Sequence, residues 1–127
     1  MSAHLLFNTR DDFYRIPISR IAFFVADKNY TVLQLTDGST LLFTISLQKM
    51  HTYIEETMGS QARIFKRVGR SHIINLMYIF HIDLAKSRLK LYAERDLREF
   101  VIPMSKESLR LLKTMYVRPS AKDLSEE

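Results

Sequence analysis

The segment of residues 30–45 constrains the fold of this chain more than any other part of the sequence. The side chains of residues 30–36 divide between two sides, with Thr31, Leu33 and Leu35 on one and Tyr30, Val32 and Gln34 on the other. The alternation resumes with Leu41, Phe43 and Ile45. A period of two is typical of β-strands, because successive side chains point to opposite faces of a sheet. The pair Asp37-Gly38 between the two segments is a strong hairpin signal. We therefore expect an antiparallel sheet in this region.

Short apolar segments on both sides of this hairpin predict further strands. Residues 21–26 form an apolar run rich in aromatic side chains, and the polar residues 27–29 after it indicate a turn. Residues 5–7 and 14–18 predict an edge hairpin, with its turn at residues 10–12. Downstream, the candidate strands are residues 79–84, 88–92 and 100–102.

Two amphipathic segments predict helices. Ser46 is a good N-cap residue, and Gly59 is well placed to end the helix that Ser46 begins. The apolar positions between them follow helical spacing: Leu47, Met50, Tyr53, Ile54 and Met58. Ser105 is expected to cap a second helix, whose buried side is predicted to carry Leu109, Leu112, Met115 and Tyr116. The predicted fold class is therefore mainly β, with two short helices.

The length of 127 residues suits one domain with its own core. We predict an N-terminal extension with the edge hairpin over residues 1–15, the domain over residues 16–117, and a flexible tail over residues 118–127. No apolar run approaches the roughly 20 residues of a membrane span. The chain also contains no cysteine. These features predict a cytoplasmic protein with no membrane partner.

Positive charge is concentrated in the second half of the chain. Residues 60–118 carry thirteen Lys/Arg against five Asp/Glu, whereas residues 1–59 carry five against six. The net charge of the whole chain is +5. A basic half within a nearly neutral chain suggests a surface that binds a polyanion.

The polar segment of residues 66–71 is the strongest candidate for a functional site. It contains two arginines, a lysine, a serine and a glycine, and two apolar patches bracket it: Ile64, Phe65 and Val68, and Ile73, Ile74 and Leu76. Apolar flanks packed in a core would hold such a segment rigidly at the surface. Guanidinium and hydroxyl groups on a rigid loop are suited to phosphate and base edges. Lys66 and Arg67 alternate along the approaching strand, so we expect only one of them to share the exposed side of the tip.

Signals of catalysis are weak. The four histidines lack metal-ligand spacing, and no Gly-rich phosphate loop or nucleophile elbow is present. The adjacent carboxylates Asp11-Asp12 and Glu55-Glu56 would diverge on a strand or helix, whereas an acid–base pair must converge. We therefore expect neither an enzyme nor a cofactor, a metal or a small-molecule substrate.

The chain resembles the LytTR family of bacterial DNA-binding domains over residues 16–115. The resemblance depends on the order and spacing of five motifs in this sequence: residues 21–30 (IAFFVADKNY), residues 36–38 (TDG), Ser46-Leu47 opening a helix, residues 65–75 (FKRVGRSHIIN) and residues 102–106 (IPMSK). It implies an elongated stack of small antiparallel sheets without a helix-turn-helix. It also implies that loops enter the major groove of duplex DNA.

The resemblance assigns DNA contacts to three places. The residues that match are Asn29 and Tyr30 after the second strand, Arg70 and Ser71 in the polar segment, and Lys106 at the start of the last helix. Arg67 and Lys28 would be neighbouring phosphate contacts. Asn75 matches a position that we interpret as structural, because a buried amide between strand residues satisfies backbone groups.

Gly69 departs from the family pattern, which commonly has histidine just before the Arg-Ser pair. Glycine permits a flexible segment or a turn with positive φ, and the sequence preference is expected to differ as a result. The resemblance also implies a possible homodimer on repeated sites. If the 127 residues are the whole gene product, a covalently attached receiver domain cannot control it.

The sequence thus predicts a sequence-specific, duplex-DNA-binding transcription regulator. The main alternative is a protein-interaction module whose basic face binds an acidic partner. A second alternative is an RNA-binding protein that stacks bases on Tyr14, Tyr30, Tyr78 and Tyr92, although these tyrosines are scattered along the chain.

Overall fold

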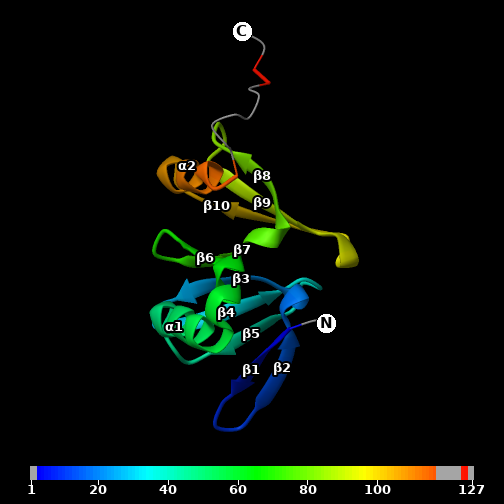
Figure 1. Cartoon of the computed structure of the whole chain (residues 1–127), viewed down its shortest axis with the longest axis vertical. Coiled ribbons are helices and arrows are strands. Elements are labelled where there is room, and N and C mark those ends of the chain that lie inside the picture. Colours follow the sequence, from blue (N-terminus) through cyan, green and yellow to red (C-terminus); the bar gives the residue numbers. More distant parts are fainter. Residues whose placement is uncertain (1–2, 117–123, 126–127) are drawn as a thin grey trace.

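The computed structural model of the protein describes residues 3–116 and 124–125. The strands of this part form three antiparallel sheets, stacked along the long axis of the molecule (Figure 1). Two α-helices complete the fold. The predicted class, mainly β with two helices in an elongated stack of small sheets, is confirmed. The predicted tail over residues 118–127 lies outside the described residues, apart from Leu124 and Ser125.

The first sheet is the predicted N-terminal hairpin, formed by β1 (His4–Asn8) and β2 (Phe13–Pro17). Its turn is closed by Asp12, whose backbone N–H donates to Thr9 Oγ1 at 3.0 Å. The inner face of the hairpin is buried, and the rings of Phe7 and Phe43 lie 4.8 Å apart. The hairpin therefore packs into the core of the molecule. The boundary drawn between residues 15 and 16 stays a prediction.

The second sheet has five strands in the order β5-β4-β3-β7-β6. Their bounds are β3 (Ile21–Asp27), β4 (Tyr30–Leu35), β5 (Thr40–Phe43), β6 (Phe65–Val68) and β7 (His72–Asn75). The hairpin predicted around Asp37-Gly38 joins β4 to β5, where the Leu35 N–H donates to the Ser39 carbonyl at 2.9 Å. Ile45, which continues the alternation in the sequence, lies beyond the end of β5.

Both faces of the five-stranded sheet are covered at β3 and β7. Phe24 and Ile73 pack with α1 and the hairpin in one core cluster. Phe23 and Ile74, their neighbours in the sequence, point to a second cluster shared with the third sheet and α2. Because both faces are covered at β3, this strand is a nearly continuous apolar run, whereas β4 keeps an alternating pattern of burial.

Helix α1 (Leu47–Met58) has the predicted boundaries. The Ser46 side chain accepts a hydrogen bond from the Lys49 N–H at 3.2 Å, and Gly59 follows with φ of 58°. The helix buries Leu47, Met50 and Ile54 against the sheet. Short 3-10 turns occur at η1 (Ile18–Arg20), η2 (Gly59–Ile64), η3 (Leu76–Tyr78) and η4 (Glu94–Asp96).

The third sheet consists of β8 (Ile79–Asp83), β9 (Arg88–Ala93) and β10 (Arg98–Pro103), and α2 (Lys106–Thr114) covers it. Ser105 caps α2 as predicted, and its side chain accepts from the Ser108 N–H at 3.2 Å. The prediction that Met115 and Tyr116 are buried is wrong, because each is 48% exposed. The helix ends at Thr114, so these two residues no longer follow its spacing, and the Tyr116 hydroxyl instead donates to the Leu76 carbonyl at 3.0 Å.

Candidate nucleic-acid interface

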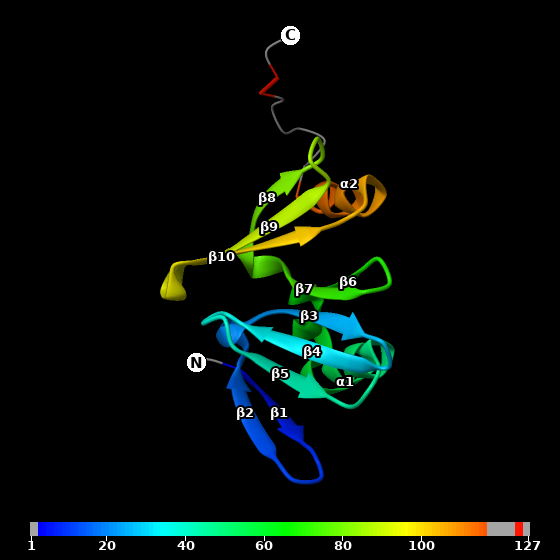
Figure 2. The ribbon, with the colours of Figure 1, turned by 180° about the vertical axis from the view of Figure 1, so that it is seen from behind.

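Three segments that are distant in the sequence meet at one side of the molecule. They are the β3–β4 turn (residues 28–29), the β6–β7 tip (residues 69–71) and the first turn of α2, on the left in Figure 1 and on the right in Figure 2. We call this side the cationic edge, because Lys28, Arg70 and Lys106 are exposed there.

The β3–β4 turn consists of two residues. Asp27 pairs with Tyr30, which leaves Lys28 and Asn29 as the connection. Lys28 has φ of 58°, a backbone conformation that residues other than glycine rarely adopt. Lys28, Asn29 and Tyr30 are all exposed. The turn therefore presents a cation, an amide and a phenol to solvent.

The β6–β7 tip is short and held by its neighbours. Val68 pairs with His72 across the hairpin, and Gly69 has φ of 61°. The glycine thus adopts the positive φ that was one of the two expectations for this position. The Ser71 carbonyl accepts from the Ala26 N–H at 2.8 Å, which ties the tip to the end of β3.

The Arg70 side chain is exposed and has no hydrogen bond or ion pair within the described residues. Ser71 beside it is also exposed. His72, the next residue, is half-buried against the ring of Phe23, and burial lowers the pKa of its imidazole. Burial thus disfavours the charged form of His72, and the exposed cation of the tip is Arg70.

Helix α2 begins next to the tip. A Cβ placed on Gly69 would lie 3.6 Å from Ser108 Oγ, so the first turn of α2 contacts the glycine side of the tip. Lys106 is the first residue of the helix and is exposed. The N–H groups of a helix N-terminus add positive potential at the same place.

Arg67 differs from the other predicted contact residues. The adjacent Lys66 is exposed, whereas Arg67 is half-buried. Arg67 Nη1 donates to Gln48 Oε1 at 2.8 Å, and Nη2 donates to the Arg70 carbonyl at 3.3 Å. Sequence reasoning did not identify Gln48, and no motif marks it, because its partner lies 19 residues away.

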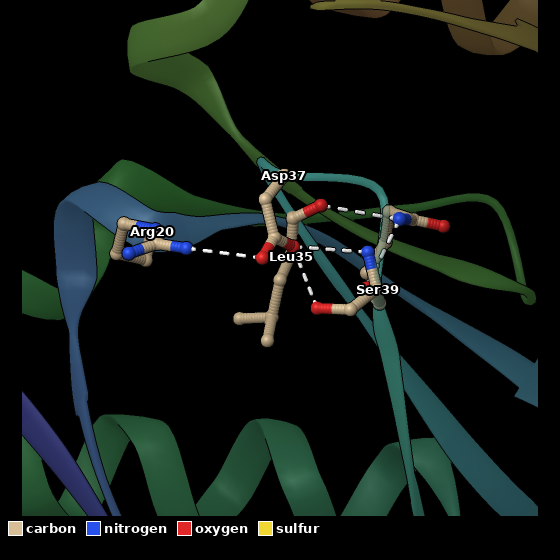
Figure 3. Close-up of polar contacts among 5 residues, drawn as sticks. Arg20, Leu35, Asp37 and Ser39 are labelled. Carbon is tan, nitrogen blue, oxygen red and sulfur yellow. Dashed lines mark hydrogen bonds and ion pairs between the residues drawn. The ribbon is translucent and has the colours of Figure 1, made fainter. Parts of the chain in front are cut away.

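At the opposite end of the strands of the five-stranded sheet, which we call the opposite edge, the charged side chains are paired within the chain (Figure 3). In the β4–β5 loop, Asp37 Oδ2 lies 3.2 Å from Arg20 Nη2, and the Ser39 hydroxyl donates to Oδ1 at 2.6 Å. The Ser39 hydroxyl and N–H, together with the Arg20 guanidinium, hold the pKa of Asp37 below its ordinary value. A Cβ placed on Gly38 would lie 2.9 Å from Arg98 Cζ, so the Arg98 guanidinium covers this loop.

Asn75 has the structural role predicted for it. It is fully buried, its Nδ2 donates to the Ile21 carbonyl at 2.8 Å, and its Oδ1 accepts from the Met77 N–H at 3.0 Å. The amide therefore joins β7 to β3 and shapes the turn that leads to the third sheet.

Other kinds of site are weakly represented in the described residues. No three His, Cys, Asp or Glu side chains cluster there as metal ligands. A hollow of 680 Å³ lies between the N-terminal hairpin, β5 and α1, and its lining includes the apolar side chains of Phe13, Ile45 and Met50. None of the helices described is long and apolar enough to cross a membrane.

Comparison with known proteins bears on this surface. A family model described as LytTr DNA-binding domain matches residues 11–116. A solved structure of the LytTr DNA-binding domain of a protein described as a methyl-accepting/DNA response regulator from Bacillus cereus is similar, with a TM-score of 0.58 and 20% identity over 91% of this chain and 96% of that one. A search of curated protein sequences found no match. The structural likeness therefore supports the fold, and the family match identifies the domain.

Proposed function

Because the chain belongs to the LytTR family of DNA-binding domains, we propose that it is a transcription regulator that recognises particular duplex DNA sequences through the cationic edge. The single observation that carries this proposal is the Arg70 guanidinium, exposed and without a partner in the described residues, on a tip held by hydrogen bonds. A charged group on a rigid loop loses little conformational entropy when it binds.

The three segments of the cationic edge take different roles in this proposal. Arg70 makes a bidentate contact with guanine, and Asn29 contacts adenine, in the major groove. Lys28 and Lys106 bind phosphates and set the position of the protein on the duplex. Tyr30 and Ser71 add hydrogen bonds to phosphate or base edges.

We also propose that the protein acts in the cytoplasm and binds repeated DNA sites as a pair of copies. Two copies on two half-sites would bind much more tightly than one, because the second contact is made at high effective concentration. Half-site spacing would then follow the helical repeat of DNA.

Selection of bound duplexes from a random pool, followed by footprinting, tests the proposal. We expect one enriched motif at physiological salt, protected in the major groove. Enrichment of no motif, together with salt-sensitive capture of an acidic protein, would support the interaction-module alternative instead. Competition of the selected duplex with single strands and structured RNA distinguishes duplex-DNA binding from the RNA-binding alternative.

A further inference from the structure

The Arg67 side chain lies behind the β6–β7 tip and links it to the start of α1. Nη1 donates to Gln48 Oε1 at 2.8 Å, and Nη2 donates to the Arg70 carbonyl at 3.3 Å. Nε is buried and has no hydrogen-bond partner in the described residues. The guanidinium therefore directs nitrogens into the protein, whereas the Arg70 guanidinium is exposed to solvent.

The Gln48 end of this link is firmly placed. Gln48 lies in the first turn of α1, directly after the cap formed by Ser46. Its neighbours Leu47 and Met50 are buried in the core. The Gln48 amide oxygen can therefore act as a fixed acceptor for Arg67.

The other end of the link is the backbone of Arg70, which determines where the Arg70 side chain projects. The Arg70 carbonyl is held by Arg67, and the next carbonyl, that of Ser71, is held by the Ala26 N–H at 2.8 Å. Gly69 on the other side has φ of 61° and adds no side chain that could fix the tip. Two consecutive carbonyls thus set the backbone from which the Arg70 side chain projects.

We infer that Gln48 and Arg67 form a clasp that positions Arg70 for base recognition, so that Arg67 acts on specificity through the tip backbone. This inference rests on the proposed function of the cationic edge. A bidentate arginine contact depends on the direction of the guanidinium plane. A clasp that narrows this direction before binding raises discrimination between sequences more than it raises affinity for phosphate.

The inference separates Arg67 from a simple phosphate contact, the role that the family resemblance implies. A phosphate contact depends on charge, so lysine would largely replace arginine, and the neutral Gln48 would have no effect. A clasp depends on the two-pronged guanidinium and on its acceptor. Lysine would then fail, and loss of the Gln48 oxygen would matter although no charge changes.

Two variants test the clasp: Gln48→Met, which keeps length and removes the acceptor, and Arg67→Lys, which keeps charge and removes the fork. We expect each to lower the ratio of affinities for the selected and random duplexes about tenfold, a range typical of coupled neighbours. The slope of log affinity against log salt should stay unchanged, and the double variant should lose no more than either single one. Thr52→Val, one helical turn further along α1 and also exposed, is the matched neutral control.

A second measurement does not depend on DNA. In the free protein, the backbone order parameters of residues 70–71 should fall in Gln48→Met from about 0.85 toward 0.6, while those of α1 stay high. Unchanged order in the tip would overturn the inference, and so would undiminished discrimination between the selected and random duplexes in Arg67→Lys. If the wild type prefers no sequence, the proposed function fails, and the order parameters alone decide on the clasp. If the wild type discriminates and Gln48→Met discriminates equally, only the clasp is refuted.

Discussion

The cationic edge and the opposite edge lie at the two ends of the strands of the five-stranded sheet, and their arginines have different surroundings. At the edge of the β4–β5 loop, Arg20 is paired with Asp37 at 3.2 Å, and Asp37 also accepts from Ser39. At the cationic edge, the Arg70 side chain has no ion pair or hydrogen bond within the described residues. Both edges have a glycine with positive φ, Gly38 and Gly69, next to these groups.

The difference indicates that the charges at the opposite edge help to stabilise the fold, whereas the charge at the cationic edge is available to a ligand. A paired charge has its partner in the folded chain and contributes to holding the loop. An unpaired guanidinium contributes little to folding and remains available for phosphate or a base. Substitutions at the first edge should therefore change stability, whereas substitutions at the second should change DNA binding.

Arg70→Ala should give the largest effect. It directly tests whether the cationic edge serves DNA binding. We expect affinity for the selected duplex to fall by about 1 to 3 kcal/mol, roughly 5- to 150-fold, with a flattened preference at one base pair. Titration of selected and random duplexes measures both effects. Arg15→Ala removes the same charge from the exposed face of β2 and should change affinity far less. Equal losses on selected and random DNA would contradict a reading role for Arg70.

The two glycines offer a matched comparison between the edges. Gly38 has φ of 97° and Gly69 has φ of 61°, so alanine at either position should lower the free energy of unfolding by about 1 to 2 kcal/mol. Gly38→Ala also crowds Arg98 and should leave DNA discrimination unchanged. Gly69→Ala should reduce discrimination because it alters the tip.

Urea unfolding and duplex titration together check the glycine comparison. Gly59→Ala is a control for backbone strain alone, because Gly59 has φ of 58° and nothing lies within 4 Å of its added Cβ. A loss of discrimination in Gly38→Ala as large as that in Gly69→Ala would show that the edges are not independent.

Features with local signals could be predicted from the sequence. Ser46 and Gly59 bound α1 as expected, because capping depends on the side chain and φ of the cap residue itself. The hairpin at Asp37-Gly38 could also be predicted, because its signal lies in these two adjacent residues. The stacking of the three sheets was predicted only through the family resemblance, since hydrophobic periodicity does not specify how sheets pack on one another.

Contacts between distant segments could not be predicted. Alternation indicated that only one of Lys66 and Arg67 shares the exposed side of the tip, but the clasp with Gln48 depends on how α1 packs beside β6. The placing of Arg98 over Gly38 likewise depends on the stacking of two sheets. Met115 was misplaced because its helical spacing continues in the sequence after α2 ends at Thr114.

Lys106→Ala sharpens the comparison by separating charge from recognition. Loss of one phosphate contact should reduce the salt slope of binding by about 0.9, with the same preferred sequence. Titrations over a range of salt concentrations measure this slope. Arg98→Ala removes one charge at the opposite edge and should leave the slope unaltered. A changed sequence preference in Lys106→Ala would mean that this residue contacts a base.

Lys28→Gly should change stability and binding in opposite directions. Glycine relieves the strain of φ at 58° but costs chain entropy, so we expect a net stabilisation of less than about 1 kcal/mol. DNA affinity should fall because a cation is lost. Leu97→Gly is the counterpart at the β9–β10 turn, with φ of 50° and a side chain that is 78% exposed. Leu97→Gly should stabilise the protein without weakening DNA binding. A loss of DNA affinity in Leu97→Gly equal to that in Lys28→Gly would contradict the assignment of DNA binding to the cationic edge.

Asp37 should give the smallest effect, in the pH dependence of stability. Its pKa in the folded protein lies below the ordinary value of 3.8, chiefly because of the Ser39 hydroxyl. The carboxylate therefore contributes stability that is present above that value and is lost as the pH falls through the folded-state pKa. Chemical unfolding across this acidic range should show a steeper loss in the wild type than in Asp37→Asn, with the two curves converging at the lowest pH. Asp83→Asn should remove another part of the loss of stability at acidic pH, because the Lys86 N–H lowers the pKa of Asp83 in a different loop. If Asp37→Asn left the acid slope unaltered, the pairing at this edge would contribute nothing to folding, and the contrast with Arg70 would rest on DNA binding alone.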